Sequence, residues 1–285
     1  MKMRAIWAVG LAGLFFVSGC TQNQPTSPAN PTQDATTSAS PGATTDPTQE
    51  VTTDEVTIYV VRHGRTMLNT TDRVQGWSDA VLTPEGEEVV KAAGRGLKDV
   101  VFQSAYSSDS GRAIQTAKLI LAENESSSEL VLENDQRFRE FNFGTWEGDL
   151  NHNMWTAAAA LSNQTMEEWL ADLSPQIFAD SVATLDKENP EAAKNWPAED
   201  YATISARLKD GIDDLVDTET AKGNGNVLLV SHGLSISALF DQVVPEFQMP
   251  EGGLKNASVS ILKYKDGEYT MESINDLSYV EKGTQ

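Results

Sequence analysis

Two histidines occupy equivalent places in the chain, because each directly follows a short apolar run. Arg62-His63-Gly64 comes after Val-Thr-Ile-Tyr-Val-Val, and Ser231-His232-Gly233 comes after Asn-Val-Leu-Leu-Val. Runs of this kind are typical of strands buried in a parallel sheet. Open α/β sheets bind ligands beyond the carboxyl ends of their strands, and a glycine after each histidine lets the backbone approach a ligand closely. We therefore expect the two imidazoles to meet at one oxyanion-sized pocket.

The composition limits which other side chains can take part in chemistry. One cysteine and three histidines exclude a disulfide framework and a zinc cluster built on thiolates. Lys and Arg together number 21 against 42 Asp and Glu, which gives a formal charge of −21. We expect no nucleic acid partner, because its phosphates would be repelled by so acidic a chain. The chemistry has to use histidine, carboxylate, hydroxyl or arginine side chains.

The single cysteine ends an N-terminal segment that has the features of a secretory signal. Lys2 and Arg4 precede an apolar run over residues 5–17, and the last residue of this run begins the sequence Val-Ser-Gly-Cys, which ends at Cys20. The apolar run is short for a membrane span. Its ending resembles the bacterial lipobox, which implies a signal peptide at 1–19 and a diacylglyceryl group on the Cys20 thiol. The sequence thus predicts a lipid anchor in the cell membrane, facing the extracytoplasmic side. An ordinary signal peptide with an incidental cysteine is the alternative.

Residues 20–55 have the composition of a disordered tether. From Thr21 to Glu55 the chain is rich in Thr, Pro, Ser, Gln and Ala, with no Lys, Arg or aromatic residue. Such a segment cannot bury enough apolar surface to offset the entropy lost on ordering. A flexible chain of this length would hold a folded domain about 30–35 Å from the membrane. The folded domain is expected over residues 56–285.

Short strands alternate with helices in the folded part. The patterns predict strands at 56–61 and 226–231, helices at 84–98 and 110–123, and a hairpin of 257–264 with 268–274 around Asp266-Gly267. This order predicts an α/β fold, a three-layer sandwich whose mainly parallel central sheet is flanked by helices.

Two acidic stretches stand apart from this alternation. Residues 149–200 are rich in Ala and in acids, with helical patches at 154–161 and 166–173. We expect a helical insertion there, packed over the sheet and forming part of the entrance to the site. The acidic run of Asp213, Asp214, Asp217 and Glu219 is expected on a solvated face.

Four short motifs follow one another along the chain. They are Arg62-His63-Gly64-Arg65-Thr66 with Asn69, Ser107-Ser108-Asp109 before Gly111-Arg112-Ala113, Arg139-Glu140 before the segment 143–148, and Ser231-His232-Gly233. Together they resemble the phosphoglycerate mutase-like branch of the histidine phosphatase superfamily. The resemblance covers about residues 56–148 and 226–240, in the order of that family. It implies the fold of that family and phosphoryl transfer without a cofactor.

The resemblance implies that His63 is the nucleophile. It would attack phosphorus through a neutral ring nitrogen, with the other nitrogen held as N–H by a backbone carbonyl, and would form a phosphohistidine. Arg62 and Arg112 would grip the phosphoryl oxygens as bidentate forks, which Lys cannot reproduce. The same two guanidinium groups would repel a divalent cation, so we expect no metal requirement.

Three further side chains complete the site that the resemblance implies. His232 would donate to the transferring phosphoryl group, and Asn69 would add a neutral amide donor. Glu140 takes the position of the family's acid, where it would protonate the leaving alkoxide and then accept a proton from water.

These inferences predict a surface-anchored phosphatase whose partner is a small phosphorylated substrate. A phosphoglycerate mutase-like phosphotransferase is one alternative, although such an enzyme would find little substrate outside the cell. A lipoprotein that keeps the fold as a silent binding module is the other, and it would not need all five of Arg62, His63, Arg112, Glu140 and His232. The sequence leaves the oligomeric state open.

Overall fold

A computed structural model describes residues 55–171 and 173–285. The predicted signal peptide at 1–19, Cys20 and all of the predicted tether except Glu55 lie outside the described residues. Within the described part of the chain, no helix combines the length and the apolar character that crossing a membrane requires.

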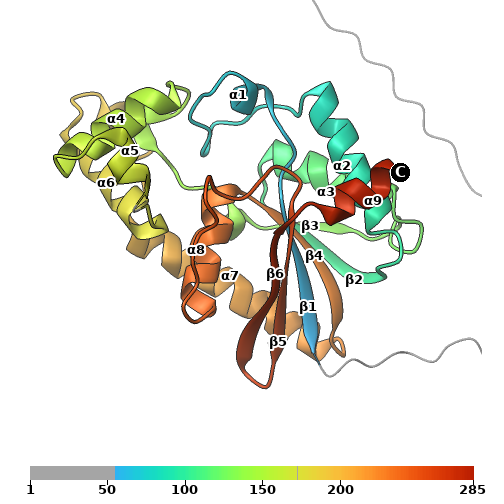
Figure 1. Cartoon of the computed structure of the whole chain (residues 1–285). Coiled ribbons are helices and arrows are strands. Elements are labelled where there is room, and N and C mark those ends of the chain that lie inside the picture. The colour runs from blue at the N-terminus through green and yellow to red at the C-terminus, as the bar shows by residue number, and fades with distance from the viewer. Residues whose placement is uncertain (1–54, 172) are drawn as a thin grey trace, which may run out of the picture. The chain divides into compact units, whose positions relative to one another are not determined.

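The centre of the fold is a mixed sheet of six strands (Figure 1). The strands are β1 (Val56–Arg62), β2 (Phe102–Ser107), β3 (Leu132–Asn134), β4 (Gly225–Ser231), β5 (Val259–Lys265) and β6 (Glu268–Asp276), in the spatial order β3-β2-β4-β1-β5-β6. The pairs among β3, β2, β4 and β1 are parallel, whereas β5 and β6 extend the sheet in antiparallel fashion. The prediction of a mainly parallel sheet is therefore confirmed.

Helices cover both faces of this sheet. They are α1 (Met67–Thr70), α2 (Pro84–Gly96), α3 (Gly111–Ala122), α4 (Asn151–Leu161), α5 (Met166–Ala171), α6 (Pro175–Glu188), α7 (Tyr201–Ala221), α8 (Gly233–Val243) and α9 (Ser278–Thr284), with short 3-10 turns at Gln136–Phe138, Gly144–Trp146 and Ala192–Lys194. Side chains alternate between the faces of a strand. Val60 accordingly lies in one core with residues of α6, α7 and α8, and Val61 lies in another with residues of α2 and α3. The sheet and its two covered faces form the expected three layers.

Local sequence signals explain where the predicted elements begin and end. The Thr83 hydroxyl accepts a hydrogen bond from Gly86 N and Pro84 occupies the first turn, which starts α2 where capping rules place it. Asp266 and Gly267 both have positive φ, 52° and 87°, as the tight turn between β5 and β6 requires.

The segment 149–200 stays outside the sheet. Its helices α4, α5 and α6 pack on one another, and α6 also contacts α7 and α8. Their buried side chains, among them Met154, Trp169 and Phe178, belong to the same core as Val60 of β1. The insertion is therefore built onto the helical layer on one face of the sheet.

One sequence prediction is wrong: Glu219 of α7 does not lie on a solvated face. Its side chain is fully buried and accepts hydrogen bonds from Tyr106 Oη at 2.7 Å, Ser104 Oγ at 2.9 Å, Gln103 Nε2 at 2.8 Å and Lys222 Nζ at 2.8 Å. Burial opposes ionisation of this carboxyl, but the four donors outweigh it and hold the pKa of Glu219 below its ordinary value. The acid thus ties α7 to β2.

Candidate active site

The parallel pairing of β1 with β4 sets His63 beside His232. Arg62 is in register with Ser231, so both strands deliver their next residue to the same edge of the sheet. The His63 amide donates to Ser231 O at 3.0 Å, which fixes the two chain exits against each other. The imidazole rings lie 5.2 Å apart between centroids, at an interplanar angle of 58°. The structure therefore brings together the two histidines that the sequence pointed to.

The environment of His63 fixes which of its ring nitrogens is free. Nδ1 lies 2.8 Å from Gly64 O, and because a carbonyl only accepts, Nδ1 must carry the hydrogen. Nε2 therefore keeps its lone pair. Burial, and then the positive charges of Arg112 and Arg62, hold the pKa of His63 well below its ordinary value. The imidazole is neutral at physiological pH, as a nucleophile requires.

His232 is buried without a protein partner. It is fully inaccessible and stands at the N-cap of α8, yet neither ring nitrogen has a hydrogen-bond partner among the described residues. Nε of Arg62 is likewise buried and unpartnered there. Burial lowers the pKa of His232 well below its ordinary value, with a further contribution from Arg112. Buried polar groups are normally paired, so these nitrogens are suited to an anion between them.

The two arginines are placed differently. Arg62 lines the main cavity, and its Nη1 donates to Leu254 O. Arg112 is fully buried and does not line the cavity. Its Nη1 donates to Ser78 O at 3.1 Å and to Asp79 Oδ1 at 2.9 Å, and its Nη2 donates to Gly76 O at 2.7 Å. Loop 76–79 thus accepts most of the hydrogen bonds of the Arg112 guanidinium group, whose positive charge also lowers the pKa of both histidines after the larger effect of burial.

The glycines after the two histidines serve packing rather than a ligand. A Cβ on Gly64 would lie 2.5 Å from Cγ2 of Val90 on α2, closer than any real contact. A Cβ on Gly233 would lie 3.2 Å from Nε of Arg62. The first glycine therefore lets α2 approach β1, and the second leaves room for the guanidinium group.

Glu140 lies at the N-terminus of α8. Its Oε2 accepts from Leu234 N at 3.1 Å, and its Oε1 accepts from Ser235 N at 2.9 Å and Ser235 Oγ at 3.1 Å. Backbone N–H groups at the start of a helix attract negative charge. The side chain is 6% exposed and still lines the cavity. These bonds hold the carboxyl group in place at the cavity's base.

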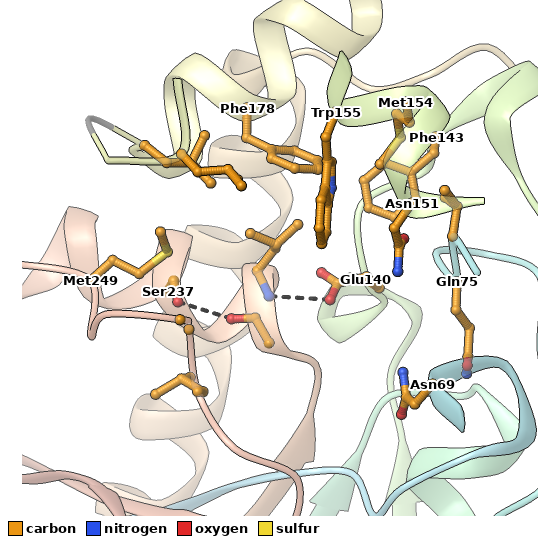
Figure 2. A pocket seen from close by; sticks show the side chains of 18 of the residues that line it. Asn69, Gln75, Glu140, Phe143, Asn151, Met154, Trp155, Phe178, Ser237 and Met249 are labelled. Atoms are coloured by element: carbon orange, nitrogen blue, oxygen red, sulfur yellow. Dashed lines mark hydrogen bonds between the residues drawn. The ribbon is translucent and has the colours of Figure 1, made fainter. Parts of the chain in front are cut away.

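Asn69 lines the same cavity, and a residue that sequence reasoning missed orients it. Asn69 Oδ1 accepts from Thr66 N at 3.2 Å and from Asn256 Nδ2 at 3.3 Å. The amide nitrogen of Asn69 is directed into the cavity (Figure 2). Asn256 Nδ2 also donates to His63 O at 3.0 Å. Asn256 belongs to none of the four motifs, so no signal in the sequence marked it.

The cavity above these polar groups has a volume of about 700 Å³, within the range of small-molecule sites. We call the part of the cavity that Arg62, His63, Asn69 and Glu140 line its base. Its walls are mostly apolar, and they include Phe143, Met154, Trp155, Leu170, Leu173, Phe178, Leu234, Met249 and Leu254 (Figure 2). The insertion lines part of the cavity, and the side chains that it turns inward are mainly apolar.

Within residues 55–171 and 173–285, no group of three or more His, Cys, Asp or Glu side chains is arranged to hold a metal ion. Imidazole, guanidinium and amide groups line the cavity together with the Glu140 carboxyl group. Groups of these kinds bind oxyanions.

Comparisons with known proteins agree with this arrangement. The sequence profile of the histidine phosphatase superfamily (branch 1) matches residues 58–277, so the chain belongs to that superfamily. It is 26% identical over 231 residues to a probable phosphoglycerate mutase of Erwinia tasmaniensis, covering 79% of this chain and 94% of that one.

Solved structures show the same relationship. A crystal structure of phosphoglycerate mutase from Bacillus anthracis str. Sterne has a TM-score of 0.75 and 43% identity, covering 83% of this chain and 100% of that one. The mycobacterial glucosyl-3-phosphoglycerate phosphatase in complex with VO3 has a TM-score of 0.57 and 26% identity, covering 78% of this chain and 98% of that one. The expected phosphoglycerate mutase-like fold is confirmed.

The buried histidines predict how stability depends on pH. In the folded protein the pKa values of His63 and His232 lie well below 6.5, whereas in the unfolded chain both groups titrate near about 6.5. Below that pH the unfolded chain binds protons that the folded chain does not. The free energy of unfolding should therefore fall as the pH falls below about 6.5, by up to about 1.4 kcal/mol per pH unit for each histidine. Above it, both states are neutral and neither histidine contributes.

Urea unfolding of the parent and of His232→Gln, at pH values from about 7.5 to 5.5, measures this dependence. The free energy of unfolding of His232→Gln should depend less steeply on pH than that of the parent, because the variant lacks one of the two buried histidines. His152 is exposed on α4, so His152→Gln controls for the loss of an imidazole as such. Equal slopes for the parent and His232→Gln would contradict the prediction.

Proposed function

We propose that the protein hydrolyses phosphate monoesters through a phosphohistidine on His63. The observation that carries this proposal is the state of His63: a buried, neutral imidazole whose Nδ1 is held as N–H and whose neighbour is His232. Membership of a superfamily whose relatives are named as mutases and phosphatases supports it.

In the first step, Nε2 of His63 attacks phosphorus and the bond from phosphorus to the ester oxygen breaks. Arg62, His232 and Asn69 donate hydrogen bonds to the equatorial phosphoryl oxygens, where negative charge collects in the transition state. The charge of Arg112 adds to the same positive field. Glu140 holds a proton once the negatively charged phosphoryl group is bound beside it, and it gives this proton to the departing alkoxide, which leaves as the free alcohol.

In the second step, a water molecule attacks the phosphohistidine from the side that the alcohol has left. Glu140, now a carboxylate, accepts a proton from this water. The bond from phosphorus to Nε2 breaks, His63 recovers its neutral lone pair, and inorganic phosphate leaves. Glu140 thus returns to its starting state at the end of the cycle.

The proposal requires no metal ion, because the positive charge around the oxyanion comes from protein groups. A divalent cation placed beside Arg62 would be repelled by it and by Arg112, the same charges that lower the pKa of His63. Phosphoryl transfer needs mainly positioning and charge stabilisation, which guanidinium and imidazole groups can supply.

We expect His63→Ala to lose nearly all hydrolysis of p-nitrophenyl phosphate, and the parent to keep its rate with EDTA present. The variant lacks the only atom proposed to bond to phosphorus. Phosphate release measures both results, and His152→Ala serves as the control for an exposed histidine. Activity that disappears in EDTA would refute the metal-free mechanism. Activity that survives in His63→Ala would refute the nucleophile.

The role of Glu140 predicts a dependence on the leaving group. Glu140→Gln keeps the size of the side chain but cannot donate an acidic proton, so turnover of an alkyl phosphate should fall about 100-fold or more. p-Nitrophenolate is a good leaving group that needs no proton from Glu140. For its ester, Glu140→Gln should therefore lower the rate of phosphohistidine formation much less. Burst kinetics separates that step from hydrolysis. Glu167→Gln is the matched control, because Glu167 also lines the cavity. Equal losses for both esters in the burst would contradict the acid role.

We propose further that the protein is anchored at the cell surface through a lipid on Cys20. The charged, apolar and small-residue regions of residues 1–20 support this attachment. We expect the parent in the membrane fraction and Cys20→Ser in a soluble or unprocessed form, since a serine hydroxyl cannot receive the thioether-linked lipid. Fractionation with mass spectrometry of the N-terminal peptide measures this. A membrane-bound, correctly cleaved Cys20→Ser would contradict the anchor.

A mutase-like phosphotransferase is the second candidate, because the Bacillus anthracis structure and the Erwinia tasmaniensis relative are both named as phosphoglycerate mutases. The two activities share the first step and differ in what accepts the phosphoryl group. A mutase returns it to a sugar acid, whereas a phosphatase gives it to water. An extracytoplasmic address would favour water.

A further inference from the structure

We propose that the cavity selects phosphate monoesters whose alcohol is a bulky apolar chain or ring, rather than small polar sugar acids. This inference rests on the proposed function of the same site and specifies its substrate class. It follows from the contrast between the polar base of the cavity and its apolar walls.

The polar groups gather where the phosphoryl group would bind. Arg62, His63, Asn69 and Glu140 all line the base of the cavity. Beyond them, α4 and α5 contribute Met154, Trp155 and Leu170 to the wall, and Phe178 comes from α6. Figure 2 shows Trp155 and Phe178 on the opposite side of Glu140 from Asn69. An alcohol leaving from the base therefore extends between apolar side chains.

This apolar wall is continuous with the core, so it is held in shape before a ligand binds. The Phe178 ring lies 5.7 Å from that of Phe143 and 5.7 Å from that of Trp169, between centroids. Trp169 is itself almost completely buried. A preformed apolar surface loses little entropy when it receives an apolar ligand. Met249, on the facing loop, has a flexible side chain that can adapt to ligands of different shape.

The distribution of charge disfavours a second anionic group on the substrate. Apart from Arg62 at the base, Arg73 is the one Arg or Lys among the described residues that line the cavity. Its Nη1 already donates a hydrogen bond to Gly148 O at 2.8 Å. Glu167 and Glu251 line the cavity as well. The carboxylate of a sugar acid would have to leave water for apolar walls or approach these acids, and both are unfavourable.

The test compares alkyl phosphates, whose leaving alcohols are about equally basic, so that rates along this series report contacts with the wall, with polar esters whose alcohols are slightly better leaving groups. Butyl, hexyl and octyl phosphate are primary alkyl esters, and glycerol 3-phosphate and 3-phosphoglycerate are their polar counterparts. We expect kcat/KM to rise about threefold for each added CH₂ group until the cavity is filled. 3-Phosphoglycerate should be hydrolysed at least about tenfold less efficiently than octyl phosphate.

Substitutions in the wall then locate the effect. Trp155→Ala should lower kcat/KM for octyl phosphate about tenfold while changing that for glycerol 3-phosphate less than about threefold. Met249→Ala, on the facing loop, should also lower kcat/KM for octyl phosphate more than that for glycerol 3-phosphate. This second variant provides the test if Trp155→Ala fails to fold. Trp196→Ala is the matched control, because Trp196 is 70% exposed and does not line this cavity.

The outcomes separate this inference from the proposed function. The esters could all be hydrolysed with no dependence on chain length, or with 3-phosphoglycerate preferred. Either result overturns the apolar substrate class but agrees with the proposed phosphatase activity. Turnover of the esters by His63→Ala overturns the proposed mechanism instead. If no ester is hydrolysed, calorimetric titration of the parent decides the substrate class alone. Binding of octyl phosphate at least about tenfold tighter than 3-phosphoglycerate supports it, and equal or weaker binding overturns it.

Discussion

The parallel pairing of β1 with β4 is the constraint on which the site depends. Because Arg62 is in register with Ser231, a shift of one residue in either strand would turn His63 or His232 to the other face of the sheet. The apolar side chains of both strands are buried on both faces, so such a shift would also expose core residues. The energy that holds the core in register thus also fixes the 5.2 Å separation of the imidazoles.

Burial and positive charge then determine the chemistry of those imidazoles. Both rings are removed from water and lie near Arg62 and Arg112, so each has a lowered pKa and remains neutral. Arg112 can be fully buried because Asp79 and the carbonyls of Gly76 and Ser78 accept its hydrogen bonds. The loop 76–79 therefore has a structural part in the site: it makes a buried guanidinium tolerable, and that guanidinium helps to keep His63 unprotonated.

Elements whose signals are local could be predicted from the sequence, and contacts that depend on tertiary packing could not. The β-branched runs before His63 and His232, the Thr83 cap and the Asp266-Gly267 turn each carry their own signal, and the structure has each element where expected. Glu219 looks like its exposed neighbours in sequence, but the periodicity of α7 turns it toward β2. Asn256 is missed for a similar reason, since its contact with Asn69 joins residues 187 positions apart.

The same distinction explains how so acidic a chain can offer a site for an anion. The formal charge of −21 is a sum over the whole sequence, whereas an anion in the cavity responds first to the groups nearest to it. Of the acids in the insertion, Glu168, Asp180 and Glu188 are exposed, and solvent and salt screen such charges. The helices turn Trp155, Leu170 and Phe178 inward, so most of the cavity wall is apolar, and among the described residues Glu167 is the one acid that the insertion places on it. The low dielectric of that wall strengthens the field of Arg62 at the base, so under the proposed function an apolar insertion would both hold an apolar alcohol and favour the phosphoryl group that it carries.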